Sequence, residues 1–299
     1  MEKPRICKDK HVIANDNNAP AKPKMQKVEA WSGKDKADEN FPVASLLIAK
    51  NLRPHIHAYY DFARNADDIS DDTSLSAQEK LARLQAIEDI LTGKQTSGSP
   101  SAETLRTSLS NSLVPDIHAR ELLVAFRRDV TKTRYESWQA LMEYCRYSAA
   151  PVGRYVLDLH GESHSTWVAS DALCASLQIL NHLQDCAKDL RALDRCYVPQ
   201  DWLHSQGLTT DEVAKSTTST SLRIVFNQML AATEILNQQA SELPKQVKSR
   251  RLRMECAVIC KLAQRLTKLL REEDPLAMRV KLNKFDMLAA TLHGLRYFI

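Results

Sequence analysis

From about Asp38 to the end of this 299-residue chain, apolar residues recur at three- and four-residue spacing with only short interruptions. This spacing places apolar side chains on one face of an α-helix. The chain has only 7 glycines and 6% aromatic residues although 43% of it is hydrophobic, which disfavours β-sandwiches and barrels. The sequence therefore predicts an all-α fold.

The interruptions are short segments that contain proline or glycine, such as Arg53-Pro54 and Pro199. They divide the chain into about ten helices. The longest are expected at 54–71, 168–190, 219–242, 248–271 and 279–298. No interruption is long enough to be a linker, so we expect a single domain over residues 37–299.

Residues 1–36 show no periodicity and carry nine Lys and Arg against five Asp and Glu. We expect them to form a disordered basic tail. The remaining residues are balanced, with 32 basic and 32 acidic side chains. A nucleic-acid-binding domain would normally carry a basic surplus, so no nucleic-acid partner is expected.

Cellular location is indicated by the cysteines and by the apolar runs. The seven cysteines lack paired spacing and no secretory leader precedes them, which favours reduced thiols in the cytoplasm. The longest apolar run is shorter than the ~20 residues needed to cross a bilayer, so any membrane contact should be peripheral, at the inner membrane surface. The basic residues between Lys248 and Arg271 fit either an anionic membrane or a solvated helix face.

Two predicted helices carry polar stripes on faces that should be apolar. The first stripe spans an arc of about 100° and consists of Tyr60, Arg64, Asp67, Asp68 and Asp71. The second spans about 80° and consists of Gln178, Asn181, Asp185 and Asp189. Ionised carboxylates are not buried unpaired, so each stripe must face a cation, a basic partner or water.

Paired carboxylates on two helices suit oxygen-preferring divalent ions. Mg²⁺ binds through one or two carboxylates together with waters and phosphates, so two facing stripes predict a clamp for a diphosphate. We expect more than one Mg²⁺, held by Asp67, Asp68, Asp71, Asn181, Asp185 and Asp189. The implied chemistry is ionisation of a carbon–diphosphate bond between apolar walls. An acidic cluster such as 67–72, taken alone, would instead be typical of a solvated helix end.

Four segments in order resemble the squalene/phytoene synthase family. Residues 60–71 (YDFARNADDISD) and 181–189 (NHLQDCAKD) are similar to its two aspartate-rich motifs, 144–153 (YCRYSAAPVG) to its tyrosine-to-glycine segment, and 195–199 (RCYVP) follows the second motif. Asp129 lies where that family keeps an acidic residue. The resemblance covers about residues 38–299. It implies a single-domain isoprenoid synthase fold with a central hydrophobic cavity and a prenyl diphosphate lipid substrate.

The resemblance also assigns roles to individual residues. It implies that the catalytic residues are Tyr144, Asp67, Asp71, Asp185 and Asp189. It implies that the substrate is bound by Phe41, Tyr60, Arg64, Gln178, Asn181, Arg195 and Tyr197. Tyr144 and Tyr197 would stabilise a carbocation through their rings, or they are core aromatic residues with hydrogen-bonded hydroxyls.

Two segments resemble the HpnC-type hydroxysqualene synthases of bacterial hopanoid biosynthesis. These are 38–45 (DENFPVAS) and 189–199 (DLRALDRCYVP), which depart from the His-Ser-x-Ser-Phe start and the Arg-Gly-Arg segment of the wider family. The resemblance implies Mg²⁺-dependent conversion of presqualene diphosphate and water into hydroxysqualene and diphosphate. No G-x-G-x-x-G turn is present, so no NADPH is expected. Neighbouring squalene-pathway enzymes are the protein partners that this reading suggests.

Two other functions fit the same fold. One is a squalene or phytoene synthase that condenses two prenyl diphosphates. The other is a non-catalytic assembly factor. The intact carboxylates of both stripes argue against the assembly factor, since a protein without metal chemistry has no reason to keep them on inward helix faces.

Overall fold

The structure, a computed structural model, describes residues 28–31 and 47–298. Within these ranges it contains α1 (Arg53–Asp71), α2 (Ala77–Leu91), α3 (Pro100–Ser112), α4 (Ile117–Thr131), α5 (Trp138–Ser148), α6 (Ala150–Leu159), α7 (Trp167–Leu193), α8 (Gln200–Ser205), α9 (Thr220–Ala240), α10 (Leu243–Gln246), α11 (Arg250–Glu272) and α12 (Lys284–Leu295), with short 3₁₀ turns at η2 (His164–Thr166) and η3 (Thr210–Ala214). Extended pairing in the described residues is limited to one isolated bridge between Arg134 and Cys196. The predicted all-α fold is confirmed.

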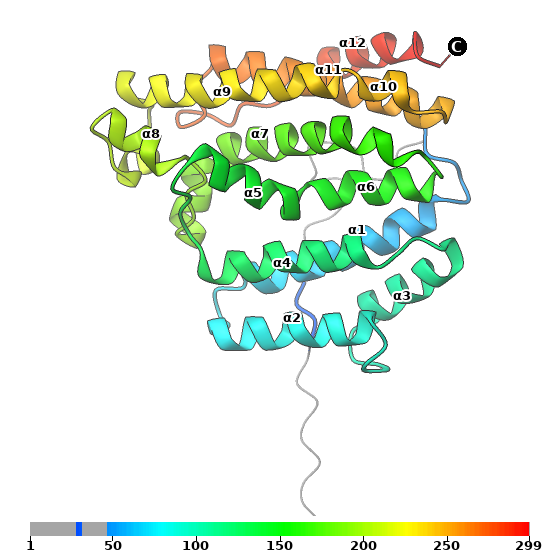
Figure 1. Ribbon diagram of the computed structural model, residues 1–299. Coiled ribbons are helices and arrows are strands. Elements are labelled where there is room, and N and C mark those ends of the chain that lie inside the picture. Colours follow the sequence, from blue (N-terminus) through cyan, green and yellow to red (C-terminus); the bar gives the residue numbers. More distant parts are fainter. Residues whose placement is uncertain (1–27, 32–46, 299) are drawn as a thin grey trace, which may run out of the picture.

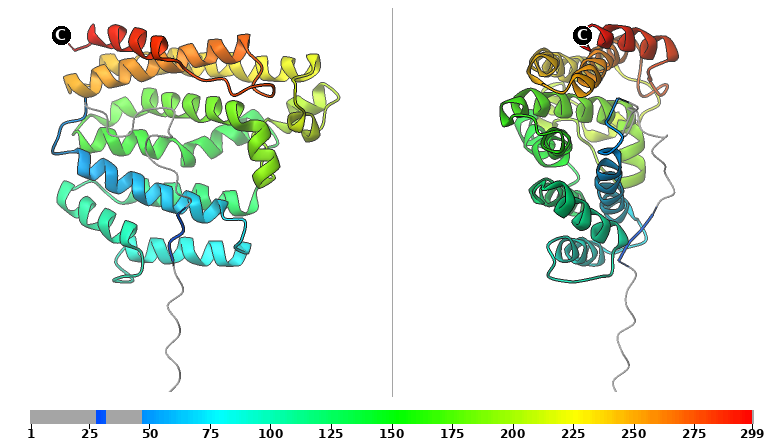
Figure 2. Two further views of the ribbon diagram at one scale, coloured as in Figure 1. Left: turned by 180° about the vertical axis from the view of Figure 1, so that it is seen from behind. Right: turned by 90° about the vertical axis from the view of Figure 1, so that its right-hand side faces the viewer.

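The helices form layers around α7 (Figures 1 and 2). Helices α9, α11 and α12 form one outer layer, and α7 packs between this layer and α6. Helix α1 packs against α3 and α4 on the other side of the molecule. The two polar stripes therefore lie on helices of different layers, α1 and α7.

The C-terminal helix is shorter than the sequence predicts. The periodicity predicts a helix over 279–298, but α12 begins at Lys284. Asn283 caps its first turn by accepting hydrogen bonds from the backbone N–H groups of Phe285 and Asp286. The backbone carbonyl of Val280 instead accepts a hydrogen bond of 2.6 Å from Gln184, which ties the segment before the cap to α7.

Four residues of the predicted tail pack against the domain. Glu29 accepts hydrogen bonds of 2.8 Å from the Ser99 hydroxyl and from the Ser101 backbone N–H at the start of α3. The Asn65 side chain of α1 donates one of 2.6 Å to the Ala30 carbonyl. The expectation of a free tail is therefore wrong for residues 28–31, because these hydrogen bonds hold them on two helices. The other residues of 1–36 lie outside the described ranges.

Among the described residues, no helix has both the length and the apolar character needed to cross a bilayer. The cysteines that the structure describes are all free thiols.

Candidate active site

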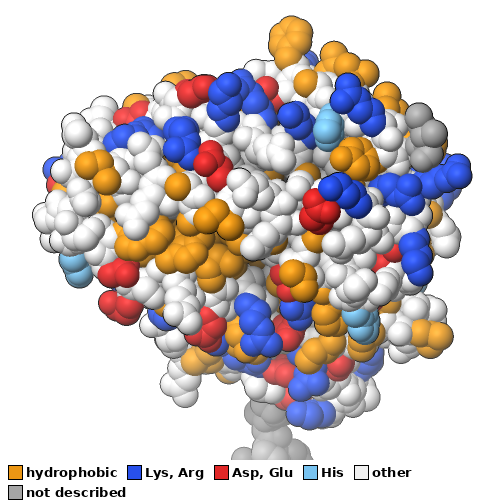
Figure 3. All heavy atoms as spheres, turned by 45° about the horizontal axis from the view of Figure 1, so that its top comes forward, with side chains coloured by type: hydrophobic (Ala, Val, Ile, Leu, Met, Phe, Trp, Pro, Cys, Tyr) orange, Lys and Arg blue, Asp and Glu red, His pale blue; other side chains and the backbone are white. Residues whose placement is uncertain are grey.

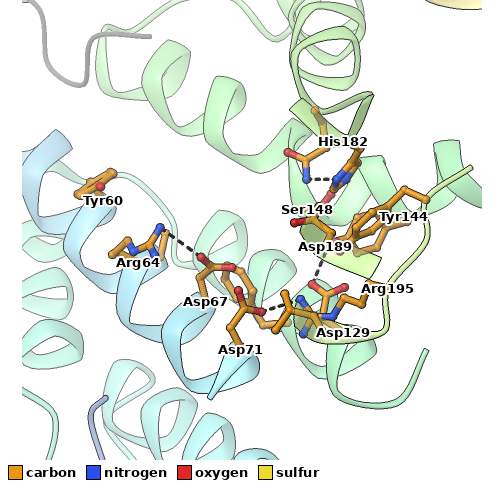
Figure 4. A pocket seen from close by; sticks show the side chains of 15 residues that line it. Tyr60, Arg64, Asp67, Asp71, Asp129, Tyr144, Ser148, His182, Asp189 and Arg195 are labelled. Atoms are coloured by element: carbon orange, nitrogen blue, oxygen red, sulfur yellow. Dashed lines mark hydrogen bonds and ion pairs between the residues drawn. The ribbon is translucent and has the colours of Figure 1, made fainter. Parts of the chain in front are cut away.

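A cavity of about 300 Å³ lies between α1, α4, α5 and α7 (Figure 4). Its wall mixes carboxylates, basic groups and aromatic rings. The lining residues are Tyr60, Ala63, Arg64, Asp67, Asp71, Phe126, Asp129, Tyr144, Ser148, Gln178, His182, Asp189, Leu193, Arg195 and Tyr197. Most of the residues predicted for the site therefore meet in one cavity.

The α1 wall presents a row of charged groups. Arg64 lies 3.3 Å from a carboxylate oxygen of Asp67, and it donates a hydrogen bond of 2.8 Å to Asp68. Asp68 is buried but does not line the cavity. Asp68 thus contacts Arg64 and its metal-binding role stays a prediction, whereas Asp67 and Asp71 are the carboxylates of α1 that face the cavity.

Arg195 joins the two halves of the site. It donates a hydrogen bond of 2.6 Å to the carboxylate of Asp71 and a second to the backbone carbonyl of Ser70. Its position depends on Asp194, which ends α7 in the left-handed region at φ 51° and turns the chain back toward α1. The guanidinium thereby lies in the cavity, as the sequence predicts for a substrate-binding group.

The α7 wall differs from the predicted stripe. Gln178 and Asp189 line the cavity, whereas Asn181 and Asp185 do not. Asp185 lies 3.8 Å from Arg279, in the segment before α12. The predicted substrate-binding role of Asn181, the catalytic role of Asp185 and the metal-binding roles of both residues therefore stay predictions that the cavity wall does not test. Phe41, the remaining predicted contact, lies outside the described residues.

An aromatic cluster closes the inner end of the cavity. Tyr144 donates a hydrogen bond of 2.8 Å to Asp129. The Tyr197 ring stacks on His182 with a centroid distance of 3.4 Å and lies 5.5 Å from the Tyr144 ring. Tyr144 is thus hydrogen-bonded and Tyr197 is packed against His182, and both residues also line the cavity.

The cavity wall has four aspartate carboxyl groups against two arginines. Burial, followed by the neighbouring Asp71, raises the pKa of Asp67 to about 8. Burial and Asp185 raise the pKa of Asp189 to about 7, with Asp71 adding to the effect from across the cavity. Burial likewise raises the pKa of Asp129 to about 7. The interior thus favours binding of additional positive charge.

These oxygen donors fit a magnesium-like ion. In the described residues, no three His, Cys, Asp or Glu side chains gather closely enough to hold an ion by themselves. Mg²⁺ needs only one or two carboxylates when waters and phosphate oxygens complete its shell. Asp67 and Asp71 on one wall and Asp189 on the other are the groups that would share such ions with a diphosphate.

A second cavity of about 310 Å³ is almost entirely apolar. It shares Tyr60 and Ala63 with the charged cavity, so the two are neighbours along α1. Its wall includes Ile56, Leu173, Leu177, Leu252 and Ile259, and Glu255 is a carboxylate among them. The predicted central hydrophobic cavity is confirmed, and Tyr60 marks its junction with the charged site.

His182 is a site residue that the sequence reasoning missed. It lies one turn from Gln178, whose amide nitrogen is 3.0 Å from its Nε2. Burial and the nearby Arg195 lower its pKa to about 3, so the ring is neutral. Its position in the second aspartate-rich motif, directly after Asn181, was the sequence feature that could have indicated it.

The sequence is similar to known proteins over most of its length. The family model for squalene/phytoene synthase matches residues 34–286. The hydroxysqualene synthase of Zymomonas mobilis is 44% identical over 89% of this chain and 90% of its own length. That of Sinorhizobium fredii is 46% identical over 86% of this chain and 87% of its own.

Solved structures share the architecture. The squalene synthase HpnC from Alicyclobacillus acidocaldarius superposes with a TM-score of 0.68 at 29% identity, over 77% of this chain and 87% of that one. A dehydrosqualene synthase in complex with a ligand superposes with a TM-score of 0.76 at 21% identity, over 88% of this chain and 92% of the other. The second likeness bears on the fold alone.

Proposed function

Because the chain belongs to the squalene/phytoene synthase family, we propose that it is a hydroxysqualene synthase, which converts presqualene diphosphate and water into hydroxysqualene and diphosphate. The observation that carries this proposal is the junction of the two cavities at Tyr60. A charged cavity that suits a diphosphate lies beside an apolar one that suits its hydrocarbon. The relatives with 44% and 46% identity carry the same activity in their names.

The charged cavity binds the diphosphate. Arg64 and Arg195 supply positive charge from opposite sides. Asp67, Asp71 and Asp189 would hold Mg²⁺, which neutralises the departing diphosphate when bound. Asp68 keeps Arg64 oriented through its 2.8 Å hydrogen bond, and Asp71 does the same for Arg195. The chain thereby keeps its cationic groups fixed before the substrate arrives.

The apolar cavity controls the fate of the ionised substrate. Loss of diphosphate breaks a carbon–oxygen bond and leaves a carbocation, which the aliphatic walls shield from bulk water. The rings of Tyr144 and Tyr197 are among the π-systems that line the charged site beside it. Capture by one water forms a new carbon–oxygen bond and releases a proton, so no hydride donor is required.

The cellular setting is inferred from the substrate. We place the enzyme in the cytoplasm with peripheral contact at the inner membrane surface, where a C30 lipid would be delivered. Its product would enter bacterial hopanoid biosynthesis through neighbouring squalene-pathway enzymes.

Purified protein should be incubated with Mg²⁺ and either presqualene diphosphate or farnesyl diphosphate, each with and without NADPH, and the products identified by mass spectrometry. We expect an alcohol from presqualene diphosphate in both NADPH conditions and little product from farnesyl diphosphate. Efficient turnover of farnesyl diphosphate would show a condensing synthase. No product from either substrate, with intact fold, would favour the assembly factor.

A further inference from the structure

Helix α12 exposes most of its large apolar side chains and packs two small residues inward. Ala290 and Gly294 face inward. A Cβ added at Gly294 would lie 2.5 Å from the Val258 side chain and 3.1 Å from the Met254 carbonyl of α11, so the two helices approach too closely for any larger residue there. This contact fixes the rotation of α12 about its axis.

The outward face of α12 is a continuous apolar stripe. Phe285 is 81% exposed, Leu288 and Leu292 are each 57% exposed, and Leu295 is also exposed. At 3.6 residues per turn these four side chains fall within an arc of about 80°. Monomeric soluble proteins rarely leave such a stripe in water unless something covers it.

Basic residues surround this stripe. The segment 279–298 carries exposed Arg279, Lys281, Lys284 and Arg296, and its one acid, Asp286, is bound to Arg265 at 2.8 Å. In Figure 3 hydrophobic side chains protrude along the upper rim of this face, with Lys and Arg side chains beside them. A covering surface must therefore accept both apolar groups and positive charge.

We propose that the α12 stripe, defined as Phe285, Leu288, Leu292 and Leu295, inserts into the interface of an anionic lipid membrane. The basic residues around the stripe favour an anionic membrane over the other possible partners. A second copy would bring the same basic rim against itself, and residues 1–27, with seven Lys and Arg against three acids, would also be repelled. An anionic bilayer offers apolar depth and negative headgroups together.

Helix α11 lies between the α12 stripe and the apolar cavity. Leu252, Cys256 and Ile259 of α11 line the apolar cavity, while Met254 and Val258 contact α12. A membrane on α12 would therefore lie one helix away from the cavity that we assign to the lipid substrate. This part of the argument rests on the proposed function; the stripe and its basic rim do not.

The test compares two double variants of the full chain. Leu288→Gln with Leu292→Gln removes the centre of the stripe. Val168→Gln with Ile235→Gln is the matched control, because these side chains are 76% and 57% exposed on α7 and α9. Both variants should keep the wild-type melting temperature and the wild-type turnover of detergent-dispersed presqualene diphosphate, since every altered side chain faces solvent.

Binding is measured by co-sedimentation with phosphatidylcholine vesicles that contain or lack phosphatidylglycerol. We expect the wild type and the control to bind the anionic vesicles, with affinity falling as salt increases. The α12 variant should bind at least about tenfold more weakly, because two leucines leave the bilayer interface.

Equal binding by the two variants would overturn the proposal. The proposal would also be overturned if the wild type did not bind vesicles but formed dimers that the α12 variant cannot form. The stripe would then be the contact surface of a second copy. Turnover of detergent-dispersed substrate separates these results from a failure of the proposed function.

Discussion

The ligand-free enzyme should become more stable when Asp67 is replaced by asparagine. The Asp67 carboxyl has a pKa of about 8 in the folded protein, against 3.8 in an unfolded chain. Folding therefore opposes its ionisation. At pH values above 3.8 the carboxyl ionises more readily in the unfolded chain than in the folded one, so the free energy of unfolding decreases. It keeps decreasing until the pH passes the folded-state pKa of about 8. An asparagine side chain keeps the shape of the protonated carboxyl without this effect.

The magnitude follows from the shift and from the exposure of the side chain. At 1.36 kcal/mol per pH unit, the difference between a pKa of 3.8 and one of about 8 would correspond to about 5 kcal/mol at pH 8. The side chain is 34% exposed, so water screens much of this. We expect Asp67→Asn to raise the free energy of unfolding by about 1–2 kcal/mol at pH 8 and by almost nothing near pH 4.

Urea unfolding from pH 4 to pH 8.5, without divalent ions, measures this difference. Asp116→Asn is a suitable control, because Asp116 lies outside the cavity at the start of α4, and its half-exposed carboxylate lies 3.9 Å from Arg120, a pair that water screens. The control should track the wild type at every pH. If Asp67→Asn is no more stable than the wild type at pH 8, the cavity does not hold the surplus negative charge that we describe.

Three further predictions concern catalysis and the N-terminal residues. Activity should require Mg²⁺ or Mn²⁺ and disappear in excess EDTA while the circular dichroism spectrum of the helices persists; full turnover with EDTA would refute the metal assignment. Asp189→Asn should reduce kcat on the order of 10²-fold, whereas Asp68→Asn should act through Arg64 and mainly raise KM; equal losses of kcat would place Asp68 in the cavity after all. Deleting residues 1–31 should lower the free energy of unfolding by about 1–3 kcal/mol, because the Glu29 hydrogen bonds to α3 are lost, but deleting 1–27 should change it little; equal melting temperatures would show that residues 28–31 do not hold the domain.

Helical periodicity located the polar stripes but not the exact rotation of each helix. On α1, four residues of the predicted arc line the cavity, and Asp68, at its edge, turns toward Arg64. On α7 the lining residues Gln178, His182, Asp189 and Leu193 are centred about 30° from Gln178, toward His182 rather than Asn181. A shift of this size is smaller than the width of a helix face, so packing with neighbouring helices decides it.

The sequence pattern also could not predict contacts between distant segments. The Arg195–Asp71 hydrogen bond depends on a left-handed turn at Asp194, a conformation that a non-glycine residue rarely adopts. Glu29 stood in a segment without periodicity, and nothing nearby marked it as a partner for the start of α3. The predicted start of α12 was too early for a local reason. The helix begins after its cap at Asn283, although the apolar spacing extends further toward the N-terminus.

Oxygen tracing tests the central claim most directly. The enzyme is incubated with presqualene diphosphate and Mg²⁺ in ¹⁸O-labelled water without NADPH, and the mass of the C30 product is recorded. Capture of the carbocation by water predicts an alcohol that carries one ¹⁸O atom. An unlabelled alcohol, or squalene that forms only when NADPH is added, would contradict the account.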